Sequence, residues 1–119
     1  MEPESDWVRL LAEYAPPHPE GSWFEPLLWP LLQAASDLPA LREVYPSLVM
    51  NCLVVYRNRE VWKSAPADRW PAASVGSDGV YAVISDAWSG EAKVFLATTD
   101  PILAAVELGK LIDAIRKRR

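Results

Sequence analysis

The chain has 119 residues, of which 50% are apolar and 24% are charged, and its net charge is −4. This length predicts a single domain over residues 1–119 that buries a core without metal or disulfide support. The negative charge repels phosphate backbones and anionic lipid, so we expect neither a nucleic-acid partner nor a membrane partner.

The start of the chain and its cysteine content indicate a compartment. Met1–Asp6 is acidic, which is the wrong charge for a secretory signal, and no apolar run approaches the length of a membrane span. The single cysteine, Cys52, excludes an intrachain disulfide and is typical of a reducing environment. We therefore expect a cytoplasmic protein, with residues 1–4 disordered.

Three helices are predicted in the first 45 residues. The first covers residues 5–15, where apolar side chains recur at the spacing of one helical face: Trp7, Leu10, Leu11 and Tyr14. The second covers residues 25–36, and Pro30 either kinks it or marks its start. The third begins at Pro39 and is ended by Pro46, because proline cannot donate the backbone hydrogen bond that continues a helix.

The pattern then changes to that of strands. Leu48–Tyr56 is a near-continuous apolar run rich in β-branched residues, which predicts one strand buried on both faces. A weak strand follows over residues 69–75, and Pro71 would confine it to a sheet edge. Two further strands, over residues 79–86 and 93–98, flank a Ser-Gly pair that is typical of a hairpin turn.

The register of this hairpin predicts two apolar faces. With Ser89 and Gly90 as the loop residues, Asp86 lies opposite Lys93. One face then carries Val80, Ala82, Ile84, Phe95 and Ala97, and the other carries Tyr81, Val83, Val94 and Leu96. Either the N-terminal helices cover one face and the last helix covers the other, or one face is a partner or homodimer surface.

A final helix begins at Asp100-Pro101 and is apolar around most of its circumference. Together these elements predict an α+β fold: N-terminal helices, an antiparallel sheet of three or four strands, and a C-terminal helix packed on the sheet.

Residues with catalytic chemistry are scattered in this sequence. His18 lies in a proline-rich loop, where we expect it to be solvated, and Cys52 lies within a buried strand, where cysteine usually acts as a small apolar filler. Four carboxylates lie near strand ends, where turns and helix caps use the same residue types: Asp78, Asp86, Glu91 and Asp100. No metal-ligand spacing and no glycine-rich phosphate loop is present. We therefore expect no metal and no cofactor, and the sequence favours a non-enzymatic protein without deciding the point.

Tryptophan and arginine give the strongest indication of a site. These residues are predicted in loops or at strand ends, where side chains are free to contact a ligand or a protein partner. Arginine can stack on tryptophan and still offer donors to a carboxylate, amide or phosphate. The predicted site consists of Arg57, Arg59, Trp62, Trp70 and Trp88.

Short motifs between residues 23 and 115 also resemble a known family. They include Leu38-Pro-Ala-Leu-Arg42, Tyr45-Pro-Ser47, Asp78-Gly-Val-Tyr81 and Thr99-Asp-Pro101. This pattern resembles a family of small uncharacterised bacterial proteins labelled natural-product-biosynthesis proteins of unknown function. The resemblance implies a role tied to a biosynthetic or interbacterial-conflict gene neighbourhood, and it implies no particular reaction.

Two functional hypotheses follow. The first is a small non-enzymatic interaction protein, of the accessory or immunity type, that binds a protein partner or a second copy through a sheet face or its aromatic end. The alternative is a natural-product biosynthesis enzyme or carrier that binds an apolar or aromatic small molecule between the sheet and the last helix. Gly109 supports the alternative, because a glycine lets that helix approach the sheet or a ligand closely.

Overall fold

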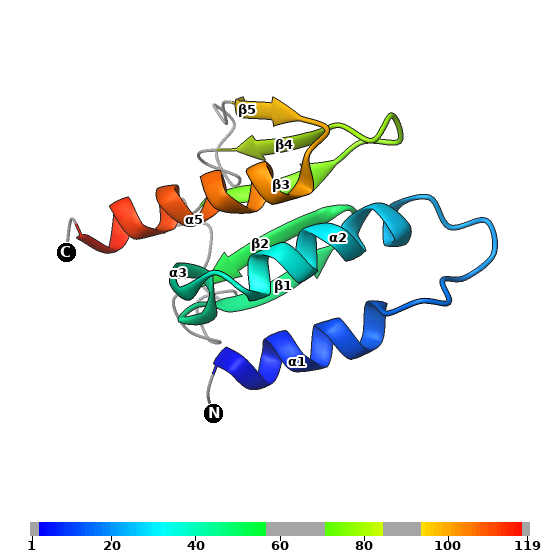
Figure 1. The fold of residues 1–119 in the computed structure, drawn as a ribbon, viewed down its shortest axis with the longest axis horizontal. Helices are drawn as coiled ribbons and strands as arrows, with labels where there is room; N and C mark the ends of the chain where they lie inside the picture. Colours follow the sequence, from blue (N-terminus) through cyan, green and yellow to red (C-terminus); the bar gives the residue numbers. More distant parts are fainter. Residues whose placement is uncertain (1–2, 57–70, 85–93, 118–119) are drawn as a thin grey trace.

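The structure, a computed structural model, describes residues 3–56, 71–84 and 94–117 (Figure 1). The helices of this part of the chain are α1 (Pro3–Tyr14), α2 (Phe24–Ser36), α3 (Pro39–Arg42) and α5 (Pro101–Lys117). The strands are β1 (Tyr45–Val49), β2 (Cys52–Tyr56), β3 (Ala72–Val75), β4 (Tyr81–Ile84) and β5 (Val94–Thr98). Helices come first, the sheet follows and a helix ends the chain, so the predicted α+β class is confirmed.

The helix boundaries differ from the predicted ones at three prolines. Helix α1 begins at Pro3, so residues 3 and 4 are helical although disorder is predicted for them. Helix α2 continues through Pro30 in its second turn, where the missing amide removes one backbone hydrogen bond of the helix. Helix α3 ends at Arg42, and Pro46 lies instead in the edge strand β1, where proline is tolerated.

The sheet has five strands in the order β1-β2-β3-β4-β5, and each neighbouring pair is antiparallel. The predicted number of three or four was too low, because the apolar run that predicts one strand forms part of a hairpin. Its two strands meet at Val49, which lies opposite Cys52, and Met50 and Asn51 make the turn. Met50 adopts a φ of 54°, which lets the chain reverse within two residues.

Strand β3 lies in the centre of the sheet, between β2 and β4. The prediction that Pro71 confines this strand to an edge was therefore wrong. Pro71 comes immediately before the first strand residue, Ala72, so its missing amide lies outside the described pairing.

The predicted hairpin register is confirmed for three residue pairs. Tyr81 lies opposite Thr98, Ala82 opposite Ala97 and Val83 opposite Leu96. The next pair joins Ile84 to Val94, because an irregularity between Val83 and Ile84 shifts the register by one residue. Such a bulge turns a side chain to the other face of a sheet.

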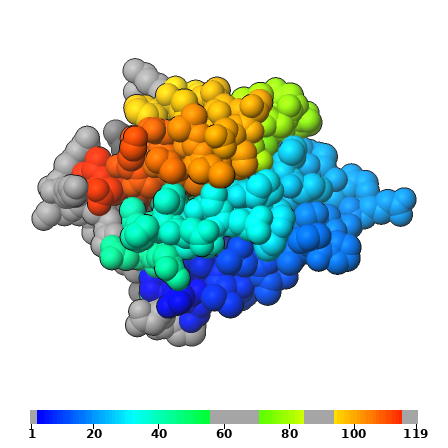
Figure 2. Space-filling model, in the orientation of Figure 1, coloured from blue at the N-terminus to red at the C-terminus, as the bar shows by residue number. Residues whose placement is uncertain are grey.

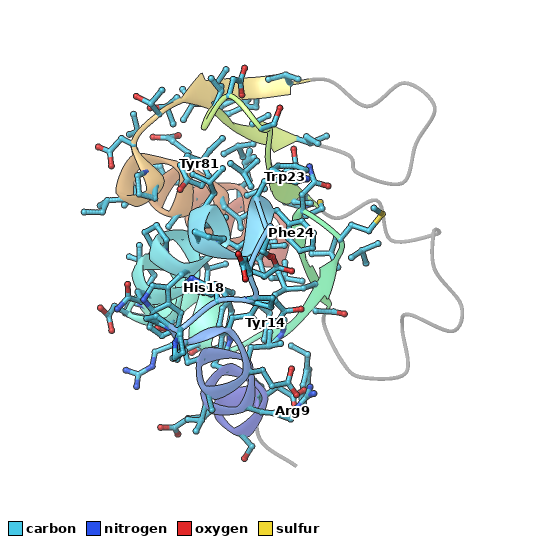
Figure 3. The ribbon with its side chains drawn as sticks, turned by 90° about the vertical axis from the view of Figure 1, so that its right-hand side faces the viewer. Arg9, Tyr14, His18, Trp23, Phe24 and Tyr81 are labelled. Carbon is cyan, nitrogen blue, oxygen red and sulfur yellow. The ribbon has the colours of Figure 1, made fainter. Side chains whose placement is uncertain are left out.

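All four described helices lie on one face of the sheet (Figures 1 and 3). Helix α1 packs against β1, while α5 packs against α2 and also against β3, β4 and β5. The core lies between these two layers and includes Leu28, Leu31, Leu32, Leu41, Leu53, Val83, Leu108 and Ile112. Of the two predicted alternatives, the one in which the last helix covers the opposite face was therefore wrong.

Two aromatic side chains connect distant parts of the chain by hydrogen bonds. Buried Trp7 donates from Nε1 to the carbonyl oxygens of Leu41 and Val44, at 2.9 Å and 3.1 Å, and so holds α1 against the segment that leads into β1. Tyr81 in β4 donates from its hydroxyl to the carbonyl oxygen of Leu27 in α2, at 2.6 Å. Because a buried carbonyl that loses its donor destabilises the fold, these bonds fix how the helical layer sits on the sheet.

Candidate partner-binding surface

The face of the sheet opposite the helices, called the outer face below, carries no charge on its described residues. Successive side chains of a strand point to opposite faces of the sheet, and the pairing register shows which residues of neighbouring strands share a face. The residues of the outer face are Tyr45, Ser47, Val49, Cys52, Val54, Ala72, Ser74, Ala82, Ile84, Val94, Phe95 and Ala97. The solvent-facing side of an antiparallel sheet normally carries polar and charged side chains. An uncharged, largely apolar face is instead typical of a surface on which another part of the chain or another molecule packs.

The middle of the outer face is buried. Val54 is 3% exposed and Ala72 is fully buried, and they form a small second cluster with Tyr45 and Cys52. Burial raises the pKa of the Cys52 thiol to about 11, so hardly any thiolate forms at neutral pH. Cys52 thus matches the predicted role of an apolar filler and is a poor nucleophile.

The β5 end of the outer face is exposed. Val94 and Phe95 are 61% and 57% exposed, and Ala97 is exposed beside them. The bulge brings Val94 to this face, because it pairs Val94 with Ile84, a neighbour of the core residue Val83. The predicted register instead placed Val94 on the core side, so sequence reasoning missed this residue.

The surface continues into the start of helix α5. Ile102 and Leu103 are both exposed there, and only Thr99 and Asp100 separate helix and strand. Figure 2 shows β5 and the first turns of α5 side by side, in yellow and orange. Four of the eight large apolar side chains that are exposed in the described part of the chain therefore lie at this border of the sheet.

The predicted aromatic and arginine site falls outside the described residues. Arg57, Arg59, Trp62 and Trp70 belong to residues 57–70, and Trp88 belongs to residues 85–93. The described residues that flank these two ranges are Tyr56, Pro71, Ile84 and Val94. The antiparallel pairing of β2, β3, β4 and β5 puts these four flanking residues at one end of the sheet. The site itself stays a prediction.

A shallow groove of about 460 Å³ runs between α3 and α5. It is lined by Leu38, Pro39, Ala40, Glu43, Val106, Gly109, Lys110 and Asp113. A β-carbon at Gly109 would lie 3.6 Å from Leu38 Cδ1, so this glycine faces α3 and not the sheet. This groove lies on the side of the helix that faces α3, and the pocket predicted between the sheet and the last helix stays a prediction.

The corner between α1 and α2 gathers the titratable residues His18, Tyr14 and Glu25. His18 Nε2 donates to the Tyr14 carbonyl oxygen at 2.8 Å, which satisfies a carbonyl at the end of α1. Burial raises the pKa of the Tyr14 hydroxyl, with a further contribution from the charges of Glu13 and Glu25. Glu25 Oε2 is buried and has no hydrogen-bond partner among the described residues. No described contact joins the imidazole to a nucleophile, so the corner lacks the geometry of an acid–base pair.

The described carboxylates at strand ends serve the backbone. Asp78 Oδ1 accepts a hydrogen bond from the Val80 amide at 3.0 Å, and Asp100 Oδ1 accepts one from the Ile102 amide at 2.9 Å. These are the turn and cap roles expected from the sequence. Asp86 and Glu91 lie outside the described residues.

Two further features are absent from the part of the chain that the structure describes. It contains no group of three or more His, Cys, Asp or Glu side chains placed to hold a metal ion. None of its helices combines the length and the apolar character that crossing a membrane requires.

In comparisons with protein-family models, with curated proteins and with solved structures, nothing matches this chain. The resemblance to the natural-product-biosynthesis family therefore stays a prediction.

Proposed function

We propose that this chain is a small non-enzymatic interaction protein, of the accessory or immunity type, that holds a protein partner on the outer face of its sheet. The observation that supports this proposal is an uncharged sheet face on which no described helix packs, exposed at Val94 and Phe95. Apolar side chains at the centre of an interface provide most of its binding energy when water is expelled from them.

The local chemistry agrees with a binding role. The Cys52 thiol on the outer face is protonated at neutral pH, and His18 is engaged with a helix carbonyl. A surface of this composition offers shape and apolar area to a partner and offers little to a reacting substrate.

A binding assay with products of genes encoded beside its own gene tests the proposal. Phe95→Lys places a charge on the exposed outer face and should weaken partner binding by about 2 kcal/mol or more, the size of a hot-spot effect. Val8→Lys is the matched control, because Val8 is 60% exposed on α1, far from the outer face. Equal binding by wild type and by Phe95→Lys would contradict the proposal.

The groove between α3 and α5 supports a second candidate function, a carrier for an apolar or aromatic small molecule. Its volume of about 460 Å³ lies within the range of small-molecule sites, and Leu38, Val106 and Gly109 give it an apolar lining. Calorimetry with candidate biosynthetic intermediates tests this function, since Ala40→Trp should fill the groove and abolish the binding heat. Binding that is unchanged in Ala40→Trp would exclude the groove.

A further inference from the structure

The two edge strands of the sheet differ in how they are protected against pairing with another strand. Edge strand β1 contains Pro46, which cannot donate a backbone hydrogen bond, and α1 packs against this strand. The Trp7 hydrogen bonds to Leu41 and Val44 hold α1 in that position. Proline and a covering helix are two of the devices by which natural sheets prevent edge pairing.

Helix α5 packs against edge strand β5, but this strand has no proline of its own. Val94–Thr98 contains no proline and no charged residue, and within the described part of the chain no strand lies beyond it. Among the described residues, the backbone amides and carbonyls on this side of β5 therefore have no strand to pair with. The exposed side chains of Val94 and Phe95 would be covered at the same time.

We propose that β5 pairs antiparallel with β5 of a second copy of this chain, giving a continuous ten-stranded sheet. This proposal rests on the proposed function, because the dimer and the protein partner would both contact the outer face at Phe95. Symmetry favours the second copy: a two-fold axis uses both β5 edges and leaves only the two protected β1 edges free, so the assembly closes. Pairing of β5 with β1 would instead leave a free β5 edge at every step, and Pro46 opposes it.

Side-chain volumes indicate the register of this pairing. With the two-fold axis at Leu96, Phe95 lies opposite Ala97 of the second copy, and a large ring meets a small methyl group on the outer face. No like charges meet along Val94–Thr98, although each copy has a net charge of −4. The strand is therefore complementary to itself in shape and in charge.

The buried area sets the expected affinity. Phe95, at 57% exposure, offers on the order of 100 Å² per copy, since an aromatic side chain buries roughly 150–250 Å² when it is covered completely. Val94, Ile102 and Leu103 add comparable areas, so these four side chains bury roughly 800 Å² over both copies, below the range of about 1,200–2,000 Å² for stable complexes. We expect a dimer that dissociates in the micromolar range.

Light scattering coupled to size exclusion, and sedimentation velocity, test the proposal over loading concentrations from about 1 μM to 1 mM. The wild-type chain should shift from monomer to dimer within this interval. The double variants Phe95→Lys/Ala97→Lys and Phe95→Glu/Ala97→Glu should each dimerise at least about 100-fold more weakly. Val8→Lys should dimerise as wild type does.

Mixing the two double variants is the decisive step. In the proposed register each lysine faces a glutamate of the other chain, so the mixture should regain a heterodimer that neither variant forms with itself. Folding of each variant is checked by its thermal melt, because Phe95 and Ala97 are exposed and their substitution should leave the melt largely unchanged.

A wild-type chain that is monomeric at 1 mM would overturn the proposal, and so would a dimer that persists in both double variants. If the chain is monomeric but binds a neighbouring gene product in a Phe95-dependent way, the dimer fails and the proposed function stands. If the mixed variants restore a dimer but no gene product binds, the dimer stands and the proposed function fails.

Discussion

Strands β1 and β5 are the two edge strands of the same sheet, and they differ in sequence and in the burial of the residues around them. A helix packs against each strand, but β1 also contains Pro46, and buried Trp7 bonds α1 to the segment before β1. The outer-face residues Val54 of β2 and Ala72 of β3 are buried, while Val49 of β1 is 46% exposed. At the β5 border Val94 and Phe95 are each more than half exposed. The contrast teaches that one sheet face can be buried in its middle and still expose apolar side chains at its border.

The largest expected effect comes from removing the cover of the β1 edge. Trp7→Ala deletes a side chain that is 2% exposed together with the donor to Leu41 and Val44, and should lower the free energy of unfolding by about 3 to 5 kcal/mol. Trp7→Phe keeps most of the volume and should cost about 1 to 3 kcal/mol, for the lost hydrogen bonds. Denaturant unfolding measures both. A loss below about 1 kcal/mol in Trp7→Ala would show that this border is not held by the indole.

The free energy of unfolding should also fall at alkaline pH, because the Cys52 thiol in the middle of the outer face is buried. The pKa of Cys52 rises from 9.0 to about 11 on folding because burial disfavours the thiolate, so its contribution to stability is complete below pH 9 and is lost as the pH rises through 11. The expected loss is about 2 to 3 kcal/mol. Burial raises the pKa values of Tyr14 and Tyr81 as well, and their effect has the same sign.

Cys52→Ala isolates the thiol in that measurement. Its stability should fall less between pH 9 and pH 11 than that of wild type, because the two tyrosines titrate in both proteins. The alkylation rate of the folded wild type at pH 8 should be roughly 100-fold below that of the unfolded chain, in proportion to the thiolate fraction. Rapid alkylation of the folded chain would mean that the middle of the outer face is not covered.

A smaller effect, of the opposite sign, is expected at the turn between β1 and β2. Met50 is 75% exposed and has a φ of 54°, a conformation that costs a non-glycine residue about 1 to 2 kcal/mol. Met50→Gly should stabilise the protein by about 0.5 to 1 kcal/mol after the entropy cost of glycine. Met50→Ala keeps the strain and should match wild type. A destabilised glycine variant would show that the methionine side chain contributes packing that its exposure hides.

The smallest effect on stability is expected at the β5 border. Phe95→Ala should change the free energy of unfolding by no more than about 0.5 kcal/mol at a protein concentration where the chain is monomeric, because the ring is largely exposed. The same variant should weaken association clearly. A large loss of stability in the monomer would move Phe95 into the core and remove the contrast between the borders.

The sequence predicted those features that depend on residues close together in the chain, namely a hairpin register and the apolar face of a helix. The register of Tyr81, Ala82 and Val83 against β5 followed from strict alternation and a local turn, and it is confirmed. The helical stripe of Trp7 and Leu10 was likewise predicted, since residues at helical spacing share one face. The predicted Arg and Trp site lies in residues 57–70 and 85–93, outside the described structure, so it remains a prediction.

Other features depend on contacts between residues far apart in the chain. Helix α5 is apolar around most of its circumference because α2 and α3 contact it on one side and β3, β4 and β5 on the other. From the sequence alone, the same pattern is equally typical of a helix that covers a second sheet face. Strand β3 is central although a proline precedes it, because the proline lies just outside the described pairing.

The sequence by itself therefore determined the α+β order of elements and three of the four described residue pairs of the last hairpin. Only the tertiary structure decided that all described helices share one face, that β5 is an exposed edge and that a bulge turns Val94 outward. The physical reason is that periodicity reports which side chains avoid water, whereas the element that covers them is selected by packing among segments distant in sequence.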